Sequence, residues 1–203
     1  MIIGSVLIFI ITILISVSID SIVLKEYKIK ERLMDLKNNK MFVVENCIII
    51  FISIILYSLL KNTREFYLYY FMVLILYKVA IIDIKTKLVN RKLLLLLVIV
   101  SLWFPFVMGI NIMNSIITSV VSFFVLFGIS KVTKGGFGMG DAKIIGILGF
   151  ALGYEGLLGV LLVSSFAVFL FSIGLLIKSR RNRTIPFVPF LLLALVSLIY
   201  LNN

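Results

Sequence analysis

Residues 142–177 read AKIIGILGFALGYEGLLGVLLVSSFAVFLFSIGLLI, an apolar run that contains only two charged residues. The whole chain has the same character: of its 203 residues, 62% are hydrophobic and 14% are charged, and the mean hydropathy is +1.22. Ordinary soluble domains are about 45–50% apolar and about 25% charged. These values exclude a water-soluble globular domain, a disordered chain and a disulfide scaffold, and they predict an all-α, polytopic membrane protein.

Apolar runs of about 20 residues, the length that crosses the hydrocarbon core of a bilayer, recur along the chain. The first run lacks a basic n-region and an A-x-A cleavage site, so we interpret it as a retained span and not as a signal peptide. The spans nearly exhaust the chain and predict one integral membrane domain over 1–203, with residues 1–65 forming N-terminal helices. About eight spans fit, with six to eight allowed: 2–24, 41–60, 66–83, 93–110, 112–131, 142–155, 156–177 and 185–201.

The charges indicate an orientation. Lys and Arg number 20 against 9 Asp and Glu, a net charge of +11. Most of the basic residues fall in the alternate loops 25–40, 84–92, 131–143 and 178–184. Cytoplasmic loops of membrane proteins carry such an excess, so this distribution predicts that these loops and both aspartates discussed below face the cytoplasm. It also argues against a nucleic-acid partner.

The chain has few residues that could bind a metal ion. With no His and with Cys47 alone, we expect no metal site.

Two of the acidic residues differ from the others, which lie in basic loops, at outer turns or at helix ends. Asp83 ends a long apolar run, and Asp141 follows a glycine-rich turn. The predicted topology puts both at the same membrane face and at similar depth, where ionisable groups are costly and usually functional. Two like charges at close range disfavour double ionisation, so one carboxylate can accept a proton from water while the other donates one. The pattern favours water-activating aspartyl chemistry.

The glycines before Asp141 suggest a loop that approaches other backbone closely. Gly135, Gly136, Gly138 and Gly140 permit positive φ and close contact, and extended substrate could pair with such a loop. The competing interpretation is a flexible turn in which Asp141 caps the next helix. A phosphate-binding loop is disfavoured because the run lacks GK[ST] and a preceding strand.

At these residues the sequence resembles the type IV prepilin peptidases, which are GxGD intramembrane aspartyl proteases. Gly138-Met139-Gly140-Asp141 matches the GxGD motif, and Asp83 in IDIKTKLVNRKL matches the segment that holds the first aspartate of that family. Residues 185–190, IPFVPF, resemble a third family segment and include Pro186 and Pro189. The resemblance covers roughly residues 75–203 and implies a prepilin-peptidase-like catalytic core over 66–203.

The resemblance implies roles for these residues. Asp83 and Asp141 would be the catalytic dyad, and Gly138, Met139 and Gly140 would form an active-site loop. Lys143, Pro186 and Pro189 would be supporting residues. The substrate would be a prepilin-like precursor with a basic leader and an apolar N-terminal helix, cut at the cytoplasmic face of the inner membrane. The partners would therefore be this precursor and the lipid bilayer.

The chain also departs from many members of that family. Their cytoplasmic loop with two CxxC pairs, which binds zinc, has no counterpart in the short first loop. We therefore expect a peptidase without a cofactor and without N-methyltransferase activity. The alternative is a non-enzymatic transporter in which Asp83 and Asp141 are ion sites, although both lie at one face and not at the midplane, where transporter sites cluster. A presenilin-like protease is disfavoured because its YD and PAL motifs do not appear in that form.

Overall fold

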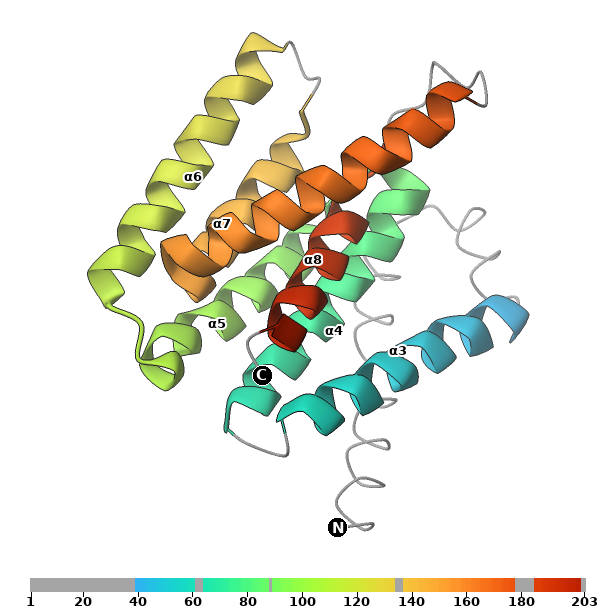
Figure 1. Ribbon diagram of the computed structural model, residues 1–203, viewed down its shortest axis with the longest axis horizontal. Helices are drawn as coiled ribbons and strands as arrows, with labels where there is room; N and C mark the ends of the chain where they lie inside the picture. Colours follow the sequence, from blue (N-terminus) through green and yellow to red (C-terminus); the bar gives the residue numbers. More distant parts are fainter. Residues whose placement is uncertain (1–38, 61–63, 88, 134–136, 178–184, 202–203) are drawn as a thin grey trace. The chain divides into compact units, whose positions relative to one another are not determined.

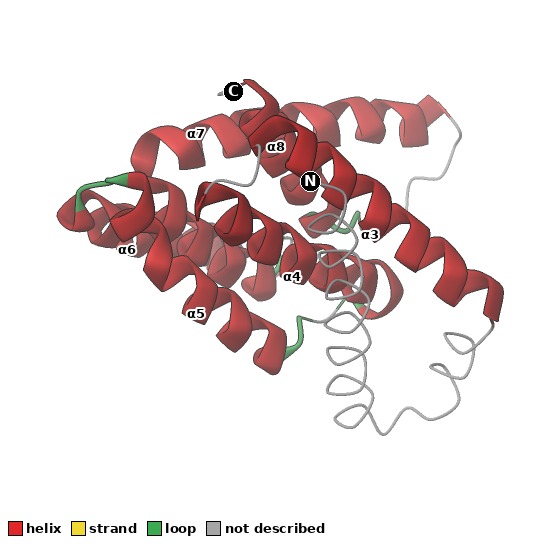
Figure 2. Cartoon of the chain, turned by 90° about the horizontal axis from the view of Figure 1, so that it is seen from below, coloured by secondary structure: helices red, strands yellow, loops and turns green. Residues whose placement is uncertain are grey.

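The computed structural model describes residues 39–60, 64–87, 89–133, 137–177 and 185–201. Within these ranges every regular element is a helix and none is a strand (Figure 2). The predicted span 2–24 lies outside the described residues. The chain divides into two compact units, Met1–Lys61 and Asn62–Asn203. The first unit contributes α3 (Asn39–Leu60), where a span is predicted over 41–60.

The second unit contains the remaining described helices, which are drawn in Figure 1. Four of them contain a stretch long and apolar enough to cross a membrane, whereas α8 is shorter. The chain is therefore a helical membrane protein, while the described helices alone do not establish the predicted count of about eight spans. The helices are α4 (Arg64–Thr86), α5 (Arg91–Met108), α6 (Ile112–Val132), α7 (Met139–Ile177) and α8 (Val188–Leu201).

A break in α7 divides this helix into two segments. Its 39 residues would extend about 58 Å as a straight helix, nearly twice the hydrocarbon thickness. Gly153 has φ 65° and ψ −174°, which is not helical, and the ribbon doubles back on itself there (Figure 1). Two segments were expected from the sequence, with the boundary between residues 155 and 156. The break lies two residues earlier because Gly153 is the residue that adopts the positive φ.

Burial differs sharply between the helices of the second unit. In α4 every residue from 72 to 80 is buried, and α4 packs against α5 and α8. In α6, by contrast, most apolar side chains are exposed, as expected of a helix that faces lipid. The helix α7 packs against α5, α6 and α8. Because α8 contacts both α4 and α7, it joins the helix that ends near Asp83 to the helix that begins near Asp141.

Candidate active site

Asp83 lies in the last turn of α4 and is 7% exposed. The helix stops just beyond it, where Lys87 adopts a left-handed φ of 55° and its N–H donates to the carbonyl of Asp83 at 2.9 Å. The backbone N–H of Val188 donates to the Asp83 carboxylate, and the charge of Lys87 attracts it. Asp83 Oδ2 is nevertheless buried without a hydrogen-bond partner among the described residues. Buried polar atoms are usually hydrogen-bonded, so the unpartnered oxygen needs an explanation. One explanation is that it binds water or substrate.

Asp141 lies in the first turn of α7 and is half-buried. It does not cap the helix, because the carbonyl of Gly138 accepts the first helical hydrogen bond, from Ala142 N at 3.2 Å. An acidic side chain in a first turn is favoured by the helix dipole. A Cβ added at Gly138 would stand 2.7 Å from Asp141 Oδ2, so the carboxylate lies directly over this glycine. Gly138 therefore leaves the space that the Asp141 carboxylate occupies.

The second glycine of the motif has a different role. A Cβ added at Gly140 would overlap Cγ2 of Val89 and stand 3.0 Å from its Cβ. Val89 belongs to the short connection that follows Asp83, so Gly140 allows α7 to begin against that connection. The expected close approach to another segment is thus confirmed at Gly140, whereas Gly138 faces Asp141 of its own segment. The expectation of positive φ is wrong for them, because the described glycines with positive φ are Gly109 and Gly153.

The predicted active-site loop also needs correction. Met139 and Gly140 lie in the first turn of α7, and only Gly138 precedes the helix. The helix begins this early because the carbonyl of Gly138 is positioned to accept the first helical hydrogen bond. Gly135 and Gly136 lie outside the described residues.

The two aspartates come together at one end of the second unit. Their carboxylates are close enough for the two negative charges to repel each other. Asp83 is at the C-terminal end of α4 and Asp141 at the N-terminal end of α7, and α8 begins beside Asp83. Asp83 is buried and Asp141 is half-buried, and the two carboxylates lie within electrostatic range of each other.

Comparison with known proteins identifies the family of the chain. The model of the type IV leader peptidase family matches residues 67–173, just over half of the chain. The chain belongs to the type IV leader peptidase family. Neither the curated proteins nor the solved structures gave a match. The matched range includes Asp83 and Asp141 and ends before α8. Membership favours a peptidase over the transporter alternative.

The three residues that the resemblance implies as supporting residues fall in two places. Pro186 precedes α8 and Pro189 is its second residue, so both flank the Val188 N–H that donates to Asp83. Lys143 is exposed and lies two residues beyond Asp141. Residues two apart on a helix do not face each other, so Lys143 is directed away from the Asp141 side of α7.

Other residues near the two aspartates were not singled out from the sequence. Ser130 Oγ donates to the carbonyl of Phe137 at 2.7 Å, and the Phe137 and Phe187 rings meet edge to face at 5.9 Å. These contacts fix the residue before Gly138 to the end of α6 and to the start of α8. Asn90 is the N-cap of α5, and its Nδ2 is buried without a partner among the described residues. No sequence pattern indicated these particular contacts.

Proposed function

We propose that the chain is an intramembrane aspartyl endopeptidase in which Asp83 and Asp141 form the catalytic dyad. The observation that carries the proposal is the buried, unpartnered Oδ2 of Asp83 within electrostatic range of the Asp141 carboxylate. Burial of two carboxylates at close range is costly, and proteins keep such pairs chiefly where they perform chemistry. Membership of the type IV leader peptidase family supports the same conclusion.

In the proposed mechanism the two carboxylates share one proton. The ionised carboxylate takes a proton from water, and the resulting hydroxide equivalent attacks the scissile carbonyl. The protonated carboxylate donates to the carbonyl oxygen as the tetrahedral intermediate forms. That intermediate collapses when the leaving amine receives the proton first taken from water. The Val188 N–H donates to Asp83 throughout and leaves Oδ2 available to water or substrate. No metal or cofactor takes part.

The substrate that we propose is a type IV prepilin-like precursor. Its leader would be cut at the cytoplasmic face of the inner membrane. The proposal of this face rests on two basic loops: 84–92, which directly follows Asp83, and 131–143, which contains Asp141. A substrate with a basic leader and an apolar helix would keep its leader in the aqueous phase while its helix lies in the bilayer. The dyad at the helix ends is at the depth where the two parts of such a substrate meet.

The decisive experiment is co-expression of the chain with a prepilin-like precursor, in which cleavage is scored by the change in precursor mobility. Asp83→Asn and Asp141→Asn should each abolish cleavage, by a factor of about 10²–10⁴ or more, while protein level is unchanged. Glu155→Gln is the matched control, because Glu155 is an exposed acid in the interior of α7, far along the chain from both aspartates. Retained cleavage in either aspartate variant would refute the dyad.

A further inference from the structure

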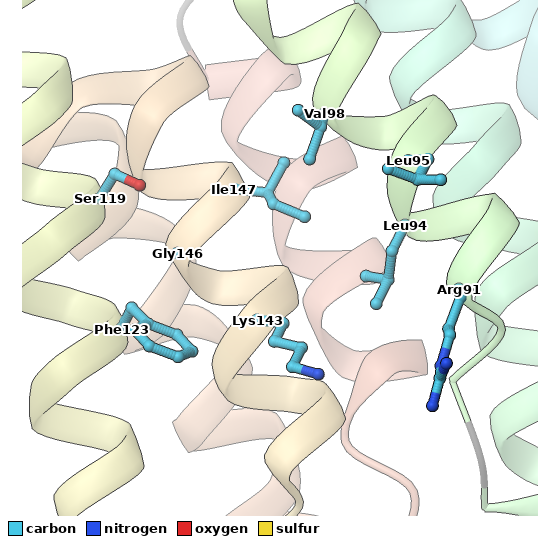
Figure 3. A pocket seen from close by; sticks show the side chains of 9 residues that line it. All are labelled: Arg91, Leu94, Leu95, Val98, Ser119, Phe123, Lys143, Gly146 and Ile147. Carbon is cyan, nitrogen blue, oxygen red and sulfur yellow. The ribbon is translucent and has the colours of Figure 1, made fainter.

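A groove runs along the second unit between α5, α6 and α7, and Lys143 on its lining lies two residues beyond Asp141. Its volume is about 490 Å³, within the range of sites that hold one small ligand. The helix α7 packs against both α5 and α6, which contact each other little, so α7 forms the floor and the other two form the walls. Figure 3 shows the side chains that line it: Arg91, Leu94, Leu95, Val98, Ser119, Phe123, Lys143, Gly146 and Ile147.

The helical register places these side chains on one face of each helix. On α5 the lining residues recur at intervals of three and four from Arg91 to Val98, and on α7 they recur in the same way from Lys143 to Ile147. Gly146 allows α7 to pack closely against α6, because a Cβ added there would stand 3.1 Å from Cβ of Phe123 on α6. The three helices have stretches long and apolar enough to cross a membrane, so the groove lies between candidate membrane spans.

Charge is confined to one end of the groove. Arg91 begins α5, Lys143 lies in the second turn of α7, and Figure 3 shows both cationic groups at the same end. Val98 and Ile147 lie further along, toward the opposite end. The lining contains no acidic residue. The groove therefore has two cationic side chains at one end and an apolar lining along the rest of its length.

We propose that this groove binds an anionic phospholipid. The phosphate group would pair with Arg91 and Lys143, since a guanidinium can hold phosphate oxygens with two parallel hydrogen bonds. One acyl chain would lie along Leu94, Val98 and Ile147. Basic pockets between membrane-spanning helices bind anionic lipid head groups in other membrane proteins. A zwitterionic lipid would find no carboxylate among the lining residues for its cationic group, so the groove discriminates by charge.

The other occupant to consider is the apolar helix of a substrate. A substrate with a basic leader would bring positive charge to the end of the groove that already holds Arg91 and Lys143. Like charges at close range disfavour that occupant. Charge complementarity therefore favours the anionic lipid.

The test is titration of the purified full chain in detergent with dioleoylphosphatidylglycerol and, separately, with dioleoylphosphatidylcholine. Bound lipid is counted by native mass spectrometry. The two lipids carry the same acyl chains, so the difference reports the head group alone. We expect tighter binding of phosphatidylglycerol, and we expect Arg91→Gln with Lys143→Gln to weaken it about twenty- to thirtyfold while phosphatidylcholine binding is unchanged. Both side chains are exposed, so the double variant should fold.

Two further variants separate the parts of the site. Lys92→Gln removes a neighbouring exposed cation that does not line the groove, and it should leave both lipids bound as in the wild type. Val98→Trp fills the apolar channel and should weaken both lipids alike. Equal binding of the two lipids by the wild type, or an unchanged preference in the double variant, would overturn the proposal. Retention of a precursor-like helical peptide in place of either lipid would also overturn it.

Discussion

The backbone N–H of Val188, the first residue of α8, donates to the carboxylate of Asp83 at the end of α4. The N–H groups in the first turn of a helix have no partner within the helix, so this bond uses a donor that is otherwise free. It fixes one side of the carboxylate and leaves Oδ2 buried without a partner among the described residues. The start of α8 therefore determines the orientation of the Asp83 carboxylate.

Val188→Pro removes this donor at a helix position where proline is tolerated. A hydrogen bond to a charged group contributes about 1.5–3 kcal/mol, so we expect kcat/KM for precursor cleavage to fall about tenfold to a hundredfold. Val188→Ala is the matched control, because it keeps the N–H and removes only buried side-chain atoms. Equal losses in the two variants would show that packing of the side chain, and not the N–H, is what matters.

Gly140→Ala should impair cleavage because the new Cβ would overlap the Val89 side chain. The start of α7, and Asp141 with it, must then shift relative to the segment that follows Asp83. A misplacement of about 1 Å can cost about a hundredfold in rate. Initial cleavage rates of purified protein measure the effect.

Two companion variants test the cause of the Gly140→Ala effect. Gly128→Ala in α6 should cleave normally, since nothing lies within 4 Å of a Cβ there. Val89→Ala should partly restore the Gly140→Ala variant, and failure of that rescue would contradict the packing explanation.

Gly153→Ala should destabilise the protein through the break in α7. The combination of φ 65° and ψ −174° is accessible essentially only to glycine, and forcing another residue into it costs about 1–3 kcal/mol. A Cβ there would also stand 3.1 Å from Ile110 Cγ2. Gly109→Ala is the comparison, because Gly109 has φ 66° and ψ 22° with open space around it. The free energy of unfolding in mixed micelles should fall more for Gly153→Ala, and the reverse order would be inconsistent with this account.

Asn90→Ala should lower the free energy of unfolding by about 1 kcal/mol, because Asn90 Oδ1 accepts from Lys92 N at 2.8 Å and caps α5. Asn90→Ser keeps a capping oxygen and removes the buried Nδ2. Unfolding measured in the same micelles should therefore show Asn90→Ser close to the wild type. If both variants lose the same stability, the buried amide group and not the cap would be responsible.

Much of the helical architecture could be predicted from the sequence. Runs of apolar residues predict membrane helices because burial in lipid depends on local composition. The expected segments 112–131 and 66–83 lie within α6 and α4. The pairing of Asp83 with Asp141 was predicted from topology, because helix ends in alternate loops share a membrane face. Their catalytic role stays a prediction until the two aspartate variants are assayed.

The tertiary structure decided the rest. Helices that are apolar on nearly all sides give no stripe that indicates which face meets which neighbour. The donor at Val188, the contact of Gly140 with Val89 and the meeting of Arg91 with Lys143 in one groove therefore depended on how the helices pack. The sequence by itself determined that the chain lies in a membrane, and it predicted that two acids lie at one membrane face. Packing determined which backbone N–H donates to Asp83 and which glycine allows the start of α7 to contact Val89. Those contacts join residues far apart in the chain.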